Sequence, residues 1–412
     1  MDSHRPIRHT DLYRLPWTLP DNSISWLEPT SACNISCDGC YRRNEPQSHK
    51  PLEVVQRELD TFKLMRRSDA ISIAGGDPLM HPEIVEIVER TVKLGFKPII
   101  NTNGACLTPE LLVQLKQAGV FGFTFHVDSK QQRSGWKGKS ESDLNELRLQ
   151  FAEMVASAGG ICCAFNSTVH LETLHSVPDV VEWAGKHIDI VHLIVFILYR
   201  TVTPEMEFDW YAGGTKANVF ATSDRIPYAS LRNGFVDLKS TDVVAEIRKR
   251  FPDFSPCAYL SGTESADSFK WLLSCRFGTK KKIHGYVGPR FMELVQSWHH
   301  FTKGCYLGYA SPRVMKRGKS LLLLSPLDAG LRAISQKYLA SVTVDPTQLF
   351  RDLRLQSIMI IQPIDVLPDG SQNMCDGCPD VTVWDGKLVW SCRLEELKTF
   401  KTWLRCVPKS SQ

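Results

Sequence analysis

The sequence predicts an α/β fold in its first half, followed by a mixed α+β region that contains cysteines. From about residue 22 to 200, short apolar runs of strand length alternate with helix-like periods, and six such β-then-α units can be counted. After Arg200 this alternation ends. Consecutive βα units place their strands side by side and parallel. The first half is therefore expected to form a parallel sheet, either curled into a partial barrel or left open.

Six strands are expected in chain order, at residues 24–29, 70–74, 97–101, 121–127, 161–169 and 190–199. Between them, apolar residues recur at helical spacing, as in Leu52, Val55, Leu59 and Phe62. The intervening helices are expected near residues 52–62, 84–92, 109–118, 144–155 and 176–186. Thr108 as N-cap, with Pro109 at the first helical position, marks one helix start with particular clarity.

Length and composition indicate an ordinary globular protein. The chain has 412 residues, of which 43% are hydrophobic and 23% charged, which favours two domains over one. We expect a lead-in at residues 1–21, a first domain at 22–200 and a second region at 201–412. Because ligands of parallel α/β folds bind at the carboxyl ends of the strands, the site is expected there. A net charge of +4 gives no basis for nucleic-acid binding.

The expected location is the cytoplasm. No stretch approaches the roughly 20 apolar residues that a membrane span requires, and the polar segment 1–10 lacks the apolar core of a secretory signal. The cytosol keeps thiols reduced. The thirteen cysteines are therefore not expected to form disulfides, and metal or cluster ligation explains the clustered ones better.

The strongest motif is a triplet of cysteines directly after the first predicted strand: Cys33, Cys37 and Cys40. Three thiolates within eight residues can hold one iron–sulfur cluster, because such clusters are bound by cysteine thiolates. Three ligands for four irons leave one iron open to a small molecule. The alternative is a structural zinc site, which needs four ligands and favours paired Cys-x2-Cys arms.

The spacing of the triplet, in this place within a βα series, resembles the radical S-adenosylmethionine (SAM) family over residues 22–200. The resemblance implies a partial (β/α)6 TIM-like barrel with a [4Fe–4S] cluster on Cys33, Cys37 and Cys40. It also implies that the open iron chelates SAM, and that an electron from the cluster cleaves SAM to methionine and a 5′-deoxyadenosyl radical. In the family, the radical takes a hydrogen atom from the substrate.

The segment Gly75-Gly76-Asp77-Pro78, which ends the second strand, resembles the family's Gly-Gly-Glu-Pro segment. In the family, this segment receives the SAM amino group through its backbone and carboxylate. Two glycines permit a close approach of the backbone to a ligand. Asp77 is one methylene shorter than the usual Glu. A segment of this kind, taken by itself, is also typical of a tight turn.

Polar residues at the ends of the next three strands resemble other SAM-binding positions: Asn103, Asp128 and Asn166. Each of them alone is also typical of a cap or a turn. One departure lies inside the triplet, where the family usually has an aromatic residue before the third cysteine and this chain has Gly39. We expect Tyr41 or the fourth-strand region to fill part of the space next to the adenine.

A second set of cysteines, Cys375, Cys378 and Cys392, lies near the end of the chain. Residues 381–390 are expected to form a hairpin with a turn at Asp385-Gly386, which would bring Cys392 back beside the other two. This arrangement suits a metal or an auxiliary iron–sulfur cluster, and resembles the SPASM-like extensions of many family members. The fourth ligand is left open among four cysteines: Cys257, Cys275, Cys305 and Cys406.

These features predict an enzyme that cleaves SAM reductively and takes hydrogen from an unactivated C–H bond, with a redox or C–C bond-forming outcome. A small molecule or a lipid is expected as the substrate, and a flavodoxin- or ferredoxin-type protein as the electron donor. Arg133, Arg200 and Arg393 are candidates for binding an acidic group. The alternatives are a metal-binding scaffold that has lost SAM turnover, and a zinc-ribbon interaction module.

Overall fold

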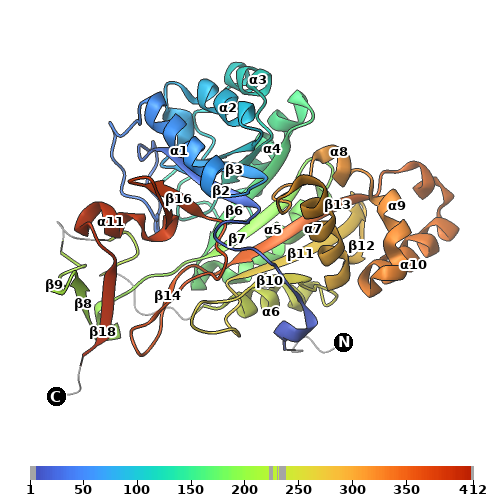
Figure 1. Cartoon of the computed structure of the whole chain (residues 1–412). Coiled ribbons are helices and arrows are strands. Elements are labelled where there is room, and N and C mark those ends of the chain that lie inside the picture. Colours follow the sequence, from blue (N-terminus) through green and yellow to red (C-terminus); the bar gives the residue numbers. More distant parts are fainter. Residues whose placement is uncertain (1–5, 222–225, 230, 232–237, 410–412) are drawn as a thin grey trace.

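The computed structural model describes residues 6–221, 226–229, 231 and 238–409. Within these residues, the main sheet has eleven strands, ten of which follow the order β1-β10-β11-β13-β7-β6-β5-β4-β3-β2, while β12 pairs with β11 alone. Figure 1 shows this sheet at the centre of the molecule, with the small C-terminal elements beside it.

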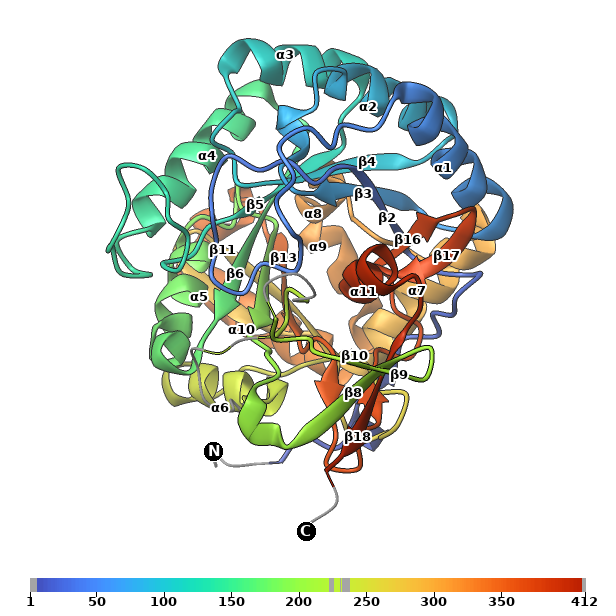
Figure 2. The same ribbon diagram turned by 90° about the vertical axis from the view of Figure 1, so that its left-hand side faces the viewer.

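The six predicted strands are present, and they are parallel neighbours in chain order. Their bounds are β2 (Ile24–Thr30), β3 (Ala70–Gly75), β4 (Lys97–Thr102), β5 (Gly122–His126), β6 (Cys162–Val169) and β7 (Leu193–Leu198). The partial barrel expected from the sequence is confirmed, because these strands follow a curve around a common centre (Figure 2).

The predicted helices follow these strands and lie outside the curve (Figure 2). Their bounds are α1 (Leu52–Met65), α2 (Ile84–Lys93), α3 (Pro109–Ala118), α4 (Asn145–Ala158) and α5 (Val177–Lys186). The predicted cap of α3 is confirmed: the Thr108 hydroxyl accepts a hydrogen bond from the Leu111 amide, and Gly119 ends the helix with φ 96°. A left-handed residue at this position favours glycine, since it has no Cβ.

Strands from the second half of the chain extend the same sheet. β13 (Arg354–Ile361) is parallel to β7, and β11 (Trp271–Thr279) is antiparallel to β13. The sheet continues through β10 (Ala258–Leu260) to β1 (Tyr13–Arg14), and β12 (Lys282–Tyr286) flanks β11. Leu272, Ile358 and Ile360 accordingly share one hydrophobic core with the first half. The boundary at 200/201 stays a prediction.

The remaining elements surround this core. The helices are α6 (Ser240–Arg250), α7 (Pro289–Lys303), α8 (Pro312–Met315), α9 (Gly318–Leu321), α10 (Ala329–Val344) and α11 (Leu394–Phe400). The 3-10 helices are η1 (His9–Asp11), η2 (Pro78–Met80), η3 (Leu171–Ser176), η4 (Pro204–Met206), η5 (Leu322–Leu327), η6 (Pro346–Phe350) and η7 (Ser391–Arg393). The small sheets are β14 (Asp365–Val366) with β15 (Gln372–Asn373), β16 (Val381–Trp384) with β17 (Lys387–Trp390), and β18 (Leu404–Pro408) with β8 (Phe208–Ala212) and β9 (Thr215–Ala217).

The segment around Cys375 and Cys378 contacts both ends of the curved sheet. On one side, Cys375 forms a β-bridge with Gly262, which follows β10. On the other side, Arg66 at the end of α1 donates to the carbonyl of Cys378 at 2.9 Å and to that of Ile24 in β2 at 3.0 Å. The segment therefore bridges the gap between the two edges of the sheet.

The predicted hairpin is confirmed as β16 and β17, with Trp384 paired to Lys387. Asp385 and Gly386 both have positive φ, 47° and 70°, as the tightest hairpin turn requires. None of the helices that the structure describes combines the length and the apolar character needed to cross a membrane.

Candidate functional site

The cysteine triplet lies in the loop after β2, at the carboxyl edge of the parallel strands. The loop is tied down at both ends. The Cys33 amide donates to Asn44 Oδ1 at 3.0 Å, and Asn44 Nδ2 donates back to the Cys33 carbonyl at 2.9 Å. Cys37 forms a β-bridge with Gln131, which follows β5. These contacts hold the loop across the open end of the barrel.

The three thiols lie close enough to influence one another. Burial raises the pKa of Cys37, and the neighbouring Asp128, Cys40 and Cys33 raise it further. They are nonetheless too far apart for one small ion. Among the described residues, just one trio of His, Cys, Asp or Glu side chains has all ligand atoms within 4.8 Å of one another, and it contains none of these cysteines. Thiolates around one tetrahedral zinc lie about 3.8 Å apart, given bonds of about 2.3 Å. The wider spacing fits a cluster that spreads its ligands over several irons.

Gly75 and Gly76 let this loop pass very close to the end of β3. A Cβ at Gly75 would lie 2.2 Å from the carbonyl oxygen of Thr30, and one at Gly76 would lie 2.2 Å from that of Ala32. Gly75 also has φ 107°, which strains any residue with a side chain. Both glycines are therefore required for packing between the strand end and the residues that precede Cys33.

Asp77 is buried, and its carboxylate joins two strand ends. It accepts hydrogen bonds from the Leu79 amide at 3.0 Å, the Asn103 amide at 2.8 Å and the Thr102 hydroxyl at 2.8 Å. Burial raises its pKa, and these donors lower it. The structure thus places the Asp77 side chain in the junction between β3 and β4, with protein donors on both of its oxygens.

Asn103 reaches the triplet directly. Its Nδ2 lies 3.7 Å from Cys33 Sγ and donates to Asn34 Oδ1 at 2.7 Å. Asn34 in turn donates to Cys106 Sγ at 3.1 Å. An amide donor beside a thiolate stabilises its negative charge. Asn103 therefore lies at the edge of the candidate cluster site, and its contact with SAM stays a prediction.

Asp128 follows the end of β5, and Asn166 lies within β6, opposite His126. The His126 ring donates through Nε2 to Asp128 Oδ2 at 2.7 Å. Burial alone would raise the pKa of Asp128, but this hydrogen bond and the His126 charge lower it to about 2. Asn166 differs, since its Oδ1 is buried and has no hydrogen-bond partner. A buried amide oxygen without a partner is costly, so Asn166 Oδ1 is available to accept a hydrogen bond from a ligand or a water molecule.

Arg133 supplies a buried positive charge beside the triplet. Its Nη2 donates to the carbonyl of Asn103 at 2.7 Å, while its Nε is buried without a partner. Burial lowers the pKa of Arg133, and Cys37, Asp128, Asp77 and Cys33 raise it, so its charge faces the thiols. Within the described part of the chain, no carboxylate lies within ion-pairing distance of Arg133. The site therefore fits an anionic group.

The space beside Gly39 is filled by an aromatic ring from another strand. Gly39 has φ 79°, and a Cβ there would lie 2.5 Å from the ring of Tyr199, which follows β7. Tyr199 stacks on His170 with ring centres 4.4 Å apart. Tyr41 lies elsewhere, with its ring 6.3 Å from that of Trp26 and its hydroxyl 3.4 Å from the Gly75 carbonyl. An aromatic ring, that of Tyr199, therefore lies beside the residue that precedes Cys40, and the expected role of Tyr41 next to the adenine stays a prediction.

This packing gives a testable prediction. Gly39→Ala is expected to reduce the amount of cluster retained after identical reconstitution, because the new methyl group meets the Tyr199 ring and the left-handed backbone adds about 1–2 kcal/mol of strain. Gly135→Ala is the matched control, since Gly135 has φ 78° and nothing within 4 Å of its Cβ position. Iron per chain measures the effect. The double variant with Tyr199→Ala is expected to recover part of the loss, and equal iron in both single variants would contradict the prediction.

The second set of cysteines also converges. A direct contact with the Cys375 thiol, together with burial, raises the pKa of Cys378. Burial, together with the nearby Cys375, raises the pKa of Cys392 to about 12. The guanidinium of Arg66 lies beside Cys378, and burial lowers its pKa to about 10. Arg66 hydrogen-bonds to backbone carbonyls there, so its charge is available to a negatively charged cluster.

The four candidates for a fourth ligand are placed differently. Cys257, directly before β10, contacts Cys275 in β11 within the core, where Cys275 Sγ also lies 3.4 Å from the Ser357 hydroxyl. Cys406 lies in β18 and packs in a separate small core. Cys305 lies next to Asp69 and His299. The first two belong to the same hydrophobic core as Cys375 and Cys378, and the choice of a fourth ligand stays open.

A buried ion pair connects the two cysteine sites. Arg42, two residues after Cys40, donates to both carboxylate oxygens of Glu28 in β2 at 2.5 Å. It also donates to the carbonyl of Ser391, directly before Cys392, at 2.6 Å. Both side chains of the pair are almost fully buried. The loop of the first site and the end of the hairpin are therefore locked to the same strand.

A cavity of about 540 Å³ opens after β7 and β13, at the same edge of the sheet as the triplet. Arg200 and Asp365 line it and pair at 2.6 Å, and the fully buried Lys270 binds the other oxygen of Asp365. The lining also includes apolar side chains: Val202, Met206, Phe269, Ile364, Val366 and Leu367. Two cations around one carboxylate leave the polar end of this cavity with a net positive charge.

Sequence reasoning missed Tyr199, His170 and the Arg42–Glu28 pair. His170 directly follows the predicted strand 161–169 and Tyr199 ends the predicted strand 190–199, so the rule that selected Asn103 and Asp128 at strand ends would have selected them. Arg42 carries no such signal, because its partner Ser391 lies 349 residues away. Arg393, an expected anion-binding residue, pairs instead with Glu396 at 2.6 Å in a buried contact.

The fold and the site define a parallel barrel with a three-cysteine cluster site at its carboxyl edge. Residues 27–184 match the family model of the radical SAM superfamily, so this part of the chain is similar to the enzymes of that superfamily. The cofactors of the superfamily are a [4Fe–4S] cluster and SAM, and its members require an electron donor. The match ends before the second set of cysteines.

Individual relatives share part of the chain. An AdoMet-dependent heme synthase of Oleidesulfovibrio alaskensis is 26% identical over 42% of this chain and 46% of its own length. A PqqA peptide cyclase of Methylorubrum populi is 26% identical over 40% of this chain and 44% of its own. The chain thus spans about half the length of these relatives. The structure of Streptococcus suis SuiB bound to S-adenosylmethionine aligns with a TM-score of 0.40 at 14% identity, over 57% of this chain and 48% of SuiB.

Proposed function

We propose that this protein cleaves SAM reductively and takes a hydrogen atom from an unactivated C–H bond of its substrate. The supporting observation is the position of Cys33, Cys37 and Cys40 beside two buried polar groups without partners, Arg133 Nε and Asn166 Oδ1. When bound, a [4Fe–4S] cluster with SAM on its open iron supplies an electron that breaks a C–S bond of SAM and yields a 5′-deoxyadenosyl radical.

The residues of the chain have distinct proposed roles. Cys33, Cys37 and Cys40 would hold the cluster, with the Asn103 amide next to the sulfur of Cys33. Arg133 would neutralise an anionic group, for which the SAM carboxylate is suitable. SAM would be surrounded by residues of neighbouring strands: Gly75, Gly76, Asp128 and Asn166. Asp77 would act through the hydrogen bond that its carboxylate accepts from the Asn103 amide.

The substrate is proposed to be a small molecule or a lipid with an acidic group. The cavity after β7 and β13 supports this, because it combines an apolar lining with the positive charge of Arg200 and Lys270. Arg200 and Lys270 both pair with the single carboxylate of Asp365, which leaves one positive charge in excess. The proposed outcome of hydrogen abstraction is a redox change or the formation of a C–C bond in the substrate.

Cys375, Cys378 and Cys392 are proposed to bind an auxiliary iron–sulfur cluster. Their burial beside Arg66 supports a negatively charged group. Such a cluster would accept an electron from a substrate radical or anchor a substrate. A cytoplasmic protein of flavodoxin or ferredoxin type is proposed as the donor to the first cluster, and the protein itself is proposed to be cytoplasmic, without a nucleic-acid partner.

The test is direct. Protein reconstituted anaerobically and reduced is expected to convert added SAM to 5′-deoxyadenosine and methionine, both measurable by chromatography. No product from protein with an intact cluster would reject SAM turnover and favour a scaffold that retains the fold. Protein purified anaerobically with zinc but without iron and sulfide would instead favour a zinc-ribbon module.

A further inference from the structure

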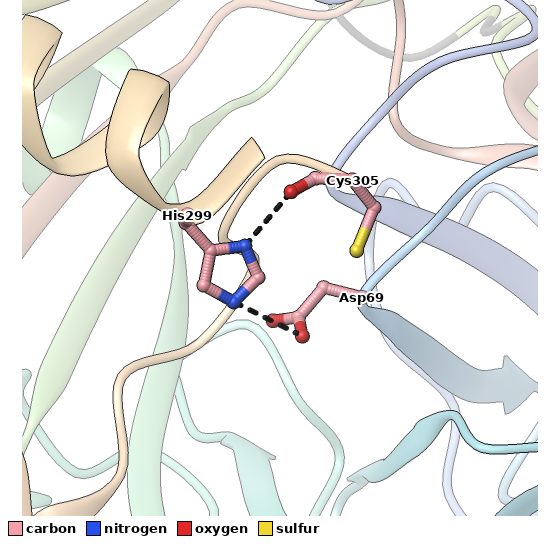
Figure 3. Close-up of side chains that lie close together, drawn as sticks. All are labelled: Asp69, His299 and Cys305. Carbon is pink, nitrogen blue, oxygen red and sulfur yellow. Dashed lines mark hydrogen bonds and ion pairs between the residues drawn. The ribbon is translucent and has the colours of Figure 1, made fainter. Parts of the chain in front are cut away.

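Three potential metal ligands from distant parts of the chain meet at the opposite end of the barrel. Asp69 directly precedes β3, His299 lies one turn before the end of α7, and Cys305 follows the turn at Gly304. One ligand atom of each lies within 4.8 Å of the other two. Figure 3 shows the three side chains directed toward a common space. Because Asp69 is at the amino end of its strand, this trio is separate from the Cys33 site at the carboxyl edge.

The orientation of His299 leaves a free lone pair at this space. Its Nδ1 lies 2.8 Å from the carbonyl oxygen of Cys305 and must carry a proton to make that hydrogen bond. In neutral imidazole, Nε2 is then the unprotonated nitrogen, and it lies 3.7 Å from Asp69 Oδ1. A lone pair that faces a carboxylate oxygen is stabilised by a cation between them. A backbone carbonyl on the other ring nitrogen is the usual support of a metal-binding histidine.

Asp69 is held in a suitable orientation by its other oxygen. Oδ2 accepts from Lys97 Nζ at 2.7 Å and from the Gly308 amide at 3.0 Å. Lys97 is itself fixed by the carbonyl of Tyr309 at 3.1 Å. These contacts leave Oδ1 directed toward His299. The charged groups that act on Cys305 are Asp69, Asp21, Lys97 and Lys303. With Cys305 as thiolate, three negative charges face two positive ones, which favours the binding of a divalent cation.

We propose that Asp69, His299 and Cys305 bind one Zn²⁺ ion. One sulfur, one imidazole nitrogen and one carboxylate oxygen are the ligand types that zinc accepts, and three protein ligands leave the fourth tetrahedral position to water. On binding, the Cys305 thiol releases its proton to solvent as the zinc–sulfur bond forms. The ion replaces the 3.7 Å contact between Nε2 and Oδ1 with two bonds of about 2.0–2.2 Å.

The ion would crosslink the two halves of the chain, because Asp69 belongs to the first half and His299 and Cys305 belong to the second. The segment after Cys305 packs against the amino ends of the barrel strands, where Tyr309 contacts Ile24, Ala70 and Ile99. A Cβ at Gly308 would lie 2.8 Å from the Ser23 carbonyl, so this approach is very close. A metal bond from β3 to α7 and Cys305 would hold this segment under the barrel, far from the redox chemistry.

The test uses the protein with its iron–sulfur clusters in place. One equivalent of Zn²⁺ is added anaerobically, loosely bound metal is removed on a chelating resin, and zinc and iron are counted per chain. Wild type is expected to retain one zinc more than Cys305→Ser or His299→Gln, at unchanged iron. The affinity of these variants for zinc should fall by more than the roughly 10–100-fold that the loss of an outer partner costs.

His300→Gln is the matched control, since the neighbouring His300 binds Asp21 at 2.8 Å and lies outside the trio. It is expected to keep the extra zinc. X-ray absorption at the zinc edge should give one sulfur near 2.3 Å and otherwise nitrogen or oxygen ligands. Several sulfurs would place the zinc in a cysteine-rich site and overturn the proposal. Equal zinc in wild type and Cys305→Ser would overturn it as well.

Discussion

The triple variant Cys33/Cys37/Cys40→Ala is expected to lose about four irons per chain and all formation of 5′-deoxyadenosine. These thiols are the proposed ligands of the first cluster. Cys106 lies near them, where its Sγ accepts a hydrogen bond from Asn34. Iron, sulfide and 5′-deoxyadenosine measure the effect. The iron that remains in the variant counts the clusters beyond the first.

Cys106→Ala is the control for this experiment. Cys106 lies close to the triplet but belongs to a separate loop after β4, and we expect its variant to keep the cluster and the product. If the triple variant kept the full iron content of the wild type, the assignment of the first cluster to these three cysteines would be wrong. If all iron disappeared, the proposal of an auxiliary cluster would be wrong.

Arg42→Ala is expected to lower the free energy of unfolding by about 3–5 kcal/mol, because it leaves the Glu28 carboxylate buried without its cation. The same change removes the hydrogen bond to the Ser391 carbonyl, so the iron bound near Cys392 is expected to be less stably held. Denaturant unfolding under anaerobic conditions measures the first effect. Iron release to a chelator measures the second.

The surface pair Arg90–Glu86 provides the comparison. It spans one helical turn at 2.5 Å and is partly exposed, so Arg90→Ala is expected to cost about 1 kcal/mol or less. Equal destabilisation by the two substitutions would show that the Glu28–Arg42 pair contributes no more than a surface contact.

The buried Glu28–Arg42 pair also makes the stability of the protein depend on pH. Burial alone would raise the pKa of Glu28, but the charge and hydrogen bonds of Arg42 outweigh it and lower the pKa below its usual value. A group with a lowered folded-state pKa stabilises the protein above its unfolded pKa of about 4.3, and this stability is lost as the pH falls through the folded value. Wild type is therefore expected to lose more stability below about pH 4.3 than Arg42→Ala does.

The order of the elements could be predicted because it depends on local patterns. The period of apolar residues gives the six strands and the helices between them, and Thr108 and Gly119 act on the backbone within one turn. The hairpin at Asp385-Gly386 is equally local, since its turn requires positive φ at two adjacent residues. The cysteine triplet lies within eight residues and needs no distant contact to be recognised.

The continuation of the sheet beyond β7 was not predictable from the same signals. β13 pairs with β7 across about 160 residues, and the strands between them join in an antiparallel sense and out of chain order. Such pairings depend on which edges remain free after the barrel has curved. Periodicity carries no information about that.

The sequence by itself determined the α/β barrel, the position of Cys33, Cys37 and Cys40 at its carboxyl edge, and the likeness to the radical SAM superfamily. Tertiary structure alone decided that Tyr199 packs on Gly39, that Arg42 joins Glu28 to Ser391, and that Asp69, His299 and Cys305 meet. The physical reason is the separation in sequence between the residues that make contact. A turn, a helix period or a close cysteine spacing is set by neighbouring residues, whereas these contacts form between segments that only the folded sheet brings together.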